Sequence, residues 1–223
     1  MQGILLVDKP SGWTSFDVVN YVRRLVSRVN GTKPKNTKVG HTGTLDPLAT
    51  GLLVLLIGKD YTRRAGDMSK HDKTYEVELT LGQTSATGDA EGPFTAGSDR
   101  VPTETEVRQA LAAFTGELMQ TPPAFSAKKV NGVRAYALAR AGETPVLEPR
   151  PVTIYANDFV DYDYPRVRFS SRVSSGTYIR VLAEDIGRQL GAGAYMSALR
   201  RTSVGEFTLA EALAPDDSEL LSK

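Results

Sequence analysis

The sequence of 223 residues contains no cysteine, only two histidines and a single tryptophan. Without cysteine, disulfide bonds, thiolate zinc sites and a cysteine nucleophile are excluded. His41 and His71 are too few for most transition-metal sites. The longest apolar run, residues 52–57, is far shorter than a membrane-spanning helix, and the first residues lack the features of a signal peptide. We therefore expect a cytoplasmic protein that works without metal.

Acidic side chains are missing from one stretch of the chain. Residues 18–45 contain no aspartate or glutamate, although the net charge of the whole chain is only +1. The cations in this stretch are Arg23, Arg24, Arg28, Lys33, Lys35 and Lys38. Such an uneven distribution is typical of a face that binds a polyanion, and equally of an uneven solvated surface.

Apolar periodicity indicates a mixture of strands and helices. Strands are predicted over 3–7, 52–57, 74–81, 152–160 and 167–173. Helices are predicted after Thr14 or Ser15, after a capping box at Thr103, and over 135–141 and 178–190. The first helix should bury Val18, Val22, Leu25, Val26 and Val29, and residues 83–99 are predicted to form a loop. Because no strict strand–helix–strand rhythm is present, the predicted class is α/β of the mixed, α+β kind.

The segment VGHTGTLDPLATGLL, residues 39–53, places three glycines before a buried strand. It is not a phosphate loop, because Gly58-Lys59 has Leu53 where the first glycine of G-x-x-x-x-G-K-[ST] belongs. A dinucleotide loop follows its strand instead of preceding it. Asp46 is the remaining candidate, either as a rigidly held reactive carboxylate or as an Asx-turn or cap residue that opens a helical turn through Ala49.

Five separated segments carry a resemblance to a known family. They are LLVDKPSGWTSFDVV, VGHTGTLDPLATGLL, KTYEVELTLGQTSATGDAEG, PPAFSAKKVNGVRAYALARAG and SSGTYIRVLAEDIGRQLG. In this order they resemble the bacterial TruB family of tRNA pseudouridine synthases, which act on uridine 55 of the T loop. The resemblance implies a catalytic domain over 1–207 with a mixed, largely antiparallel sheet flanked by helices. It also implies an inserted RNA-binding thumb over 122–143 and an acidic tail over 208–223 in place of a full PUA-type domain.

The resemblance also implies the chemistry. It makes Asp46 the catalytic aspartate, Arg180 its partner and Tyr75 the residue that packs on the target base. The enzyme would be a cofactor-independent isomerase that breaks the N1–C1′ bond of uridine and joins C5 to C1′. A carboxylate can attack C1′ or stabilise cationic character there. Addition to C6 and a glycal route remain open on the sequence alone.

Residues that bind the RNA are implied in the same way. His41 would fill the space left by the flipped uridine, while Tyr178 and Leu199 would line the pocket. The thumb cations expected to contact phosphates are Lys128, Lys129 and Arg140. The implied partner is the T stem-loop of tRNA, with no membrane, and we expect a monomer.

Two other functions stay open. A tRNA-binding or folding module with secondary or no catalysis would use the basic lobe but would not need a buried carboxylate. A hydrolase that cleaves nucleosides or carbohydrates would need a second carboxylate, and the sequence offers no plausible one beside Asp46.

Overall fold

The computed structural model describes residues 1–126, 128–130 and 132–221, without the side chains of Lys129 and Arg134. The chain forms two compact units, which are described separately. Unit 1 contains Met1–Tyr75 and Leu199–Lys223, and unit 2 contains Glu76–Ala198. Strands β4 (Lys73–Leu81) and β12 (Ala194–Val204) each contribute residues to both units.

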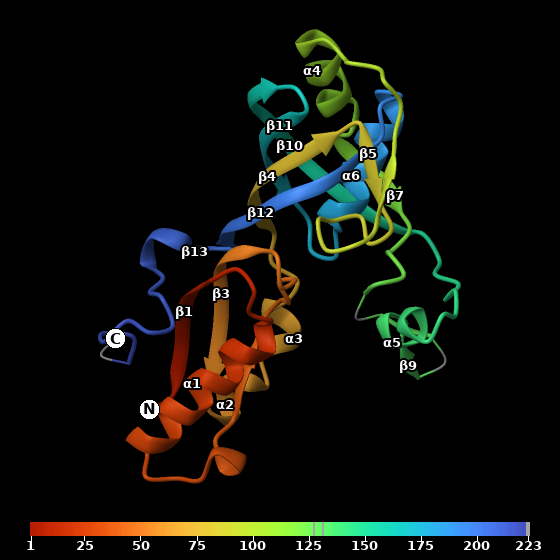
Figure 1. Ribbon diagram of the computed structural model, residues 1–223. Coiled ribbons are helices and arrows are strands. Elements are labelled where there is room, and N and C mark those ends of the chain that lie inside the picture. The colour runs from red at the N-terminus through yellow and green to blue at the C-terminus, as the bar shows by residue number, and fades with distance from the viewer. Residues whose placement is uncertain (127, 131, 222–223) are drawn as a thin grey trace. The chain divides into compact units, whose positions relative to one another are not determined.

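Unit 1 is built on strand β3 (Thr50–Ile57), which has partners on both edges (Figure 1). On one edge, β1 (Gly3–Lys9) pairs with it antiparallel from Gly3–Ile57 to Lys9–Gly51. On the other edge, β2 (Val39–His41) pairs antiparallel with residues 55–57, and β12 pairs parallel with residues 50–51. On this second edge, residues 52–54 therefore lie in the gap between the stretch that pairs with β12 and the stretch that pairs with β2.

Strand β3 is buried on both faces, which confirms the prediction from its continuous apolar sequence. One face packs on helix α1 (Ser15–Val29), and the other packs on the short helix α3 (Ala65–Met68). The first face contributes Leu53, Leu55 and Ile57, and the second contributes Leu52, Val54 and Leu56. The smaller elements of this unit are α2 (Lys59–Thr62), β13 (Phe207–Thr208) and the 3-10 turns Pro34–Asn36 and Leu209–Glu211.

Helix α1 begins at a capping box. The Thr14 hydroxyl accepts from the Asp17 N–H at 3.1 Å, and the Asp17 carboxylate accepts from the Thr14 N–H at 2.8 Å. The expectation that Val29 is buried is wrong, since its side chain is 64% exposed. The next residue, Asn30, is hydrogen-bonded to Met1, ahead of the first residue of β1. Val29 has therefore passed the end of the sheet on which the helix packs.

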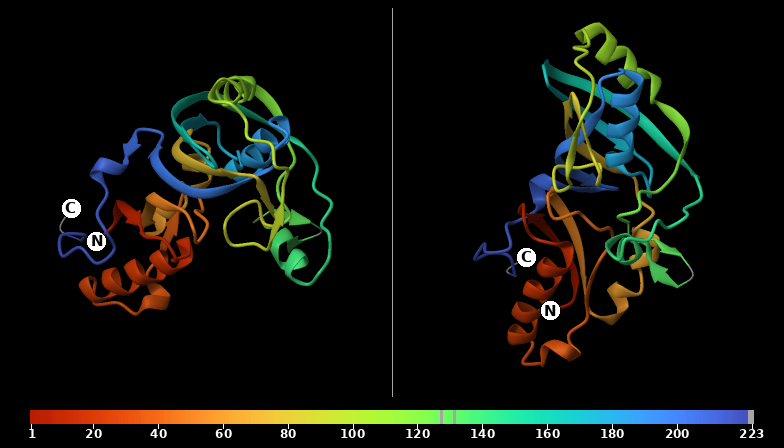
Figure 2. Two further views of the ribbon diagram at one scale, coloured as in Figure 1. Left: turned by 45° about the horizontal axis from the view of Figure 1, so that its top comes forward. Right: turned by 45° about the vertical axis from the view of Figure 1, so that its right-hand side comes forward.

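Unit 2 contains a sheet in the order β4–β11–β10–β7, with β12 on the outer edge of β4. The strands are β11 (Arg166–Val173), β10 (Arg150–Asp163) and β7 (Gly116–Gln120), with β10 antiparallel to both neighbours. Helix α4 (Glu104–Ala113) lies next to β10 and α6 (Ile179–Gln189), as Figures 1 and 2 show. The mixed, mostly antiparallel sheet with helices confirms the predicted fold class.

Two segments of unit 2 refine the sequence predictions. The expected loop 83–99 contains the strands β5 (Gln83–Ser85) and β6 (Phe94–Ala96), which pair antiparallel. These strands are short and mainly polar, so backbone pairing holds them without apolar alternation. The lobe 122–143 contains β8 (Lys129–Val130), β9 (Val133–Arg134) and α5 (Ala135–Arg140), and it protrudes from the sheet of its unit (Figure 2). Asn131, in an Asn-Gly pair typical of a tight turn, lies outside the described residues.

No helix in the described parts of the chain is both long and apolar enough to span a bilayer.

Replacing Leu53 with alanine tests the central role of β3. Leu53 is 0% exposed, so Leu53→Ala should lower the free energy of unfolding by about 2–5 kcal/mol. Denaturation in urea, followed by circular dichroism, measures this change. The exposed Val29→Ala serves as the control and should change the free energy by less than about 0.5 kcal/mol. Equal effects of the two substitutions would contradict the assignment of β3 as the core.

Candidate functional site

Asp46 lies on a tight turn between β2 and β3. The Ala49 N–H donates to the Asp46 carbonyl at 3.1 Å, and no helix follows. The Asp46 side chain is half-buried, whereas Leu45 and Ala49 on either side of it are buried at 3% and 0% exposure. The carboxylate is thus carried by a turn that is anchored at both ends.

The start of the chain holds this turn from one side. Lys9 is fully buried, and its ammonium donates to the carbonyls of Pro10 at 2.8 Å, Trp13 at 2.5 Å and Pro47 at 3.2 Å. The Gly12 N–H donates to the same Pro47 carbonyl at 2.9 Å. The segment DKPSGW therefore folds back on the residue that follows Asp46.

Ser15 fixes the residue that precedes Asp46. Its hydroxyl accepts from the Leu45 N–H at 2.8 Å and donates to the Leu45 carbonyl at 2.9 Å. Ser15 is the first residue of α1, so the capping box at Thr14 also determines where this hydroxyl lies. Both backbone groups of the buried Leu45 are satisfied by one side chain.

Arg201, on β12, supplies donors where β3 lacks a partner strand. Its side chain is 1% exposed, and its guanidinium donates to the Leu52 carbonyl at 2.7 Å and to the Gly43 carbonyl at 3.1 Å. A Cβ on Gly51 would lie only 2.3 Å from the Arg201 carbonyl oxygen, at a φ of +97°. The glycine thus lets β12 approach β3 closely enough to place the guanidinium.

Two more titratable groups accompany Arg201. Lys73 donates to the carbonyls of Ser69 at 3.0 Å and His71 at 2.5 Å, and burial, reinforced by Arg201, lowers its pKa to about 8. Burial, followed by the charge of Arg201, also lowers the pKa of His41, which favours a neutral imidazole at neutral pH. In the part of the chain that the structure describes, the buried His41 Nδ1 has no hydrogen-bond partner.

Unit 1 contains four of the predicted site residues. Asp46 and His41 flank the same connection, while Tyr75 and Leu199 are buried, with exposures of 7% and 9%. The Leu199 carbonyl accepts from the Thr50 hydroxyl at 3.5 Å, at the start of β3.

Unit 2 contains Arg180, in the first turn of α6. Its side chain is 6% exposed, and its guanidinium donates to the carbonyls of Thr87 at 3.0 Å and Phe125 at 2.9 Å. Its Nε also lies 3.6 Å from the carboxylate of Asp89, which is 2% exposed and accepts from the Thr87 hydroxyl at 2.6 Å. The expected pairing of Arg180 with Asp46 joins residues of different units and stays a prediction.

The remaining predicted residues are also in unit 2. Gln120 holds the backbone of Tyr178 through two hydrogen bonds, of 2.7 and 3.0 Å. In the lobe 122–143, Lys128 is half-buried, and burial followed by Arg150 lowers its pKa. Arg140 is exposed and lies 5.7 Å from the ring centre of Tyr136. The Lys129 side chain and residue Ala127 lie outside the described parts.

The side chains that hold the site together were not among the predicted site residues. These are Lys9, Ser15, Lys73, Asp89 and Arg201. All except Arg201 lie within the segments that carry the family resemblance, which was the available signal. A fully buried lysine or arginine is rare, and its sequence looks like that of an exposed one. Among the described residues, no three His, Asp or Glu side chains are grouped to hold a metal ion.

Residues 30–179 match the family model described as TruB family pseudouridylate synthase (N terminal domain). Residues 180–218 match the tRNA pseudouridylate synthase B C-terminal domain, which includes part of the segment expected to be an acidic tail. The chain therefore belongs to the TruB family of pseudouridylate synthases and is an isomerase, which confirms the resemblance.

Individual relatives support this family assignment. The tRNA pseudouridine synthase B of Chlamydia trachomatis serovar L2 is 43% identical over 224 residues, covering 100% of this chain and 88% of the relative. That of Arthrobacter sp. (strain FB24) is 48% identical, covering 95% and 69%. A crystal structure of a Cbf5-Nop10-Gar1 complex is similar with a TM-score of 0.67 and 30% identity. That match covers 92% of this chain, which spans only 50% of the matched chain.

Removing the Ser15 hydroxyl tests the anchor of the turn. Ser15→Ala leaves the Leu45 N–H and carbonyl buried without partners, so unfolding should become easier by about 1–3 kcal/mol. Ser11→Ala is the matched control, because Ser11 is exposed and donates to the Leu48 carbonyl at 3.3 Å. Urea denaturation of both variants measures the difference. If the two variants were equally stable, the Ser15 contacts would not anchor the turn.

Lys73 should make stability depend on pH in a defined window. Because its pKa is about 8 in the folded protein and 10.5 in the unfolded chain, the unfolded state binds more protons between these values. The contribution of Lys73 to stability should therefore rise as pH increases from 8 towards 10.5. Lys73→Met should remove this rise, measured as the difference in unfolding free energy between wild type and variant. Lys70→Met, at a 75% exposed side chain, should leave the pH profile unchanged.

Proposed function

We propose that this chain is a tRNA pseudouridine synthase that converts uridine 55 of the T loop to pseudouridine. Membership of the TruB family and the relatives named as tRNA pseudouridine synthase B support the substrate class. The observation that carries the proposal is the Asp46 turn, which Lys9, Ser15 and Arg201 hold on both sides. A binding protein has no need for a carboxylate fixed in this way.

The reaction changes the atom through which the uracil base is attached to the ribose, from N1 to C5. The N1–C1′ bond breaks, the base turns, and a C5–C1′ bond forms. The proton leaves C5, and N1 takes a proton, so atoms balance without a cofactor. In this proposal the Asp46 carboxylate is the group that reacts with the nucleoside. A turn held by buried donors keeps the carboxylate in place while the base rotates, which lowers the entropic part of the barrier.

Other residues would receive the flipped uridine. The target must leave the helical stack before a carboxylate can reach it. A neutral His41 suits the space that the flipped base leaves, because an uncharged imidazole can stack on the neighbouring bases without needing a counter-ion. Tyr75, Tyr178 and Leu199 are assigned to the pocket of the base, and Arg180 is assigned as the partner of Asp46.

The lobe 122–143 would bind the RNA around the target uridine. The lobe 122–143 is proposed as a thumb whose cations Lys128, Lys129 and Arg140 contact phosphates of the T stem-loop. We propose a monomeric cytoplasmic enzyme, with a catalytic domain over 1–207 and the residues from 208 onward outside the reaction.

Asp46→Asn tests the reaction. With unmodified tRNA that carries tritium at C5 of uridine, wild type should release tritium without releasing uracil. The amide keeps the shape of the carboxylate but cannot react, so release should fall by roughly 1,000-fold or more. The dissociation constant for the tRNA, measured by filter binding, should stay within about threefold.

The control is Asp60→Asn, which removes one carboxylate at a 78% exposed position of unit 1 and should keep the wild-type rate. Persistence of activity in Asp46→Asn within a few-fold would contradict the role of Asp46. Free uracil from the wild type would indicate a hydrolase. Tight binding by the wild type without tritium release would indicate a tRNA-binding module.

A further inference from the structure

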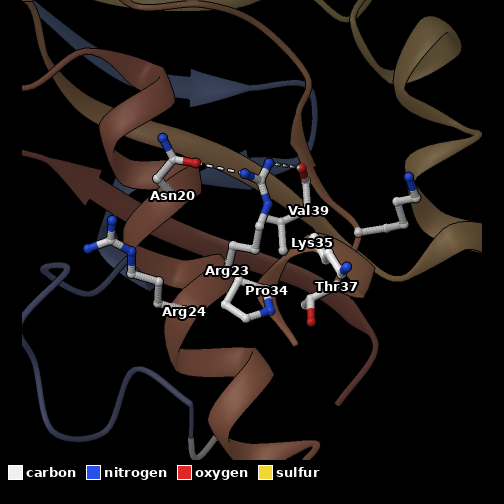
Figure 3. Close-up of a pocket in the computed structure, with 8 residues that line it drawn as sticks. Asn20, Arg23, Arg24, Pro34, Lys35, Thr37 and Val39 are labelled. Atoms are coloured by element: carbon white, nitrogen blue, oxygen red, sulfur yellow. Dashed lines mark hydrogen bonds between the residues drawn. The ribbon is translucent and has the colours of Figure 1, made fainter. Parts of the chain in front are cut away.

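A pocket of about 520 Å³ lies in unit 1 on the side of α1 (Figure 3). Helix α1 and the segment before β2 form its walls. The lining residues are Asn20, Arg23, Arg24, Pro34, Lys35, Thr37, Lys38 and Val39. Four of the eight carry a positive charge and none carries a negative one. This pocket has no role in the site described above.

Among the described residues, no carboxylate neutralises the charges in this pocket. The lining residues all come from the stretch 18–45, which contains no aspartate or glutamate. Within the described residues, none of the four cations lies within ion-pair distance of an Asp or Glu. Elsewhere in unit 1 the exposed cations Arg63 and Lys70 each have a carboxylate partner. Unpaired cations gathered in one concavity create a positive potential that attracts an anion.

One of the four cations is held in a fixed orientation by neutral groups. The Arg23 guanidinium donates to the Asn20 side chain at 2.6 Å and to the Val39 carbonyl at 3.4 Å. Figure 3 shows it between these two residues, with Arg24 and Lys35 on other sides of the pocket. Since its partners carry no charge, Arg23 keeps its full charge. An oriented guanidinium loses little side-chain entropy when it binds a phosphate oxygen.

An exposed aromatic ring extends the surface along the helix. Phe16 is 61% exposed and lies 5.9 Å from the Arg23 guanidinium. Phe16, Asn20 and Arg23 are spaced by four and three residues, so they lie on one face of α1. Cations beside a solvent-facing aromatic ring are the combination with which proteins hold a nucleic-acid backbone and stack an unpaired base.

The pocket is tied to the Asp46 turn by strand β2. Val39 lines the pocket, and His41 ends the strand, two residues or about 7 Å further on. Because pocket, strand and turn belong to the same unit, their spacing is set by backbone pairing with β3. An RNA whose target uridine lies at Asp46 therefore has phosphates only a few nucleotides away from the pocket.

We propose that this pocket binds the phosphate backbone of the substrate RNA, as a contact surface on the catalytic unit additional to the thumb. The inference rests on the proposed function for the identity of the RNA. Arg23 is its oriented member, and Arg24, Lys35 and Lys38 add mobile charges. These contacts position the RNA without reading its sequence.

The test is the salt dependence of tRNA binding. Arg24→Gln/Lys35→Gln removes two exposed charges and spares the structural bonds of Arg23. The slope of log Kd against log salt should decrease by about 0.7–0.9 for each lost phosphate contact, or roughly 1.4–1.8 in total. If both proteins bind equally at 1 M salt, this difference corresponds to roughly 25- to 60-fold weaker binding of unmodified tRNA at about 0.1 M salt. Filter binding from about 50 to 300 mM KCl measures the slope, and thermal melting verifies that the variant is folded.

Arg63→Gln/Lys70→Gln is the matched control. It removes the same net charge from exposed positions of the same unit, and it should leave the slope within about 0.3 of wild type. An unchanged slope in the pocket variant, or an equal loss in the control, overturns the proposal. A third outcome is that the pocket variant loses binding of inorganic phosphate while its tRNA slope stays at the wild-type value. This result would indicate a free anion as the ligand, and it also overturns the proposal.

The two proposals fail separately in these experiments. If the pocket variant shows the expected decrease in slope but wild type releases no tritium, the isomerase proposal is refuted. The pocket assignment then still stands. Wild type that releases tritium while the pocket variant binds normally refutes only the pocket.

Discussion

The structure of unit 1 depends on backbone carbonyls that strand pairing does not reach. Around Asp46 the chain leaves β2 and returns in β3, and the carbonyls of Gly43, Pro47 and Leu52 accept hydrogen bonds from side chains. Two buried cations, Lys9 and Arg201, supply the missing donors. Removing a charge from water costs several kcal/mol, which charge-assisted hydrogen bonds to several carbonyls at once offset. The backbone of a polar turn is thereby held within the protein, and this turn carries the half-buried Asp46.

The cations of this unit fall into two classes that the net charge of +1 does not reveal. The buried ones act on the backbone, and burial, reinforced by the charge of Arg201, lowers the pKa of Lys73 and His41. The exposed ones on α1 and the segment before β2 have no carboxylate partners in the described structure and face solvent. Carboxylates are instead placed at other positions of the chain, where they form local ion pairs such as Arg188 with Asp185. An acid-free stretch of sequence thus corresponds to an uncompensated surface.

The sequence predicted the elements with strong periodicity and missed those that depend on tertiary contacts. Strand β3 and the alternation along β4 were evident, because burial on one or both faces leaves a direct pattern. The hairpin of β5 and β6 was missed, since its strands are too short and polar to show one. Asp46 was identified from its motif, whereas its supports were not, because Lys9 and Arg201 are separated from it by many residues. Asp89, the carboxylate beside Arg180, also became evident only in three dimensions.

The hydrogen bond from Arg180 to the Phe125 carbonyl has a mechanical consequence. Phe125 belongs to the base of the lobe 122–143, so the lobe is tethered at its root to the first turn of α6. A displacement of that root either carries the guanidinium with it or breaks the bond. Arg180 also contacts Thr87 and Asp89 in the connection between β5 and β6, and it therefore links two separate segments of unit 2 to α6. The root of the lobe and the loop of Thr87 and Asp89 are thus joined through one buried side chain.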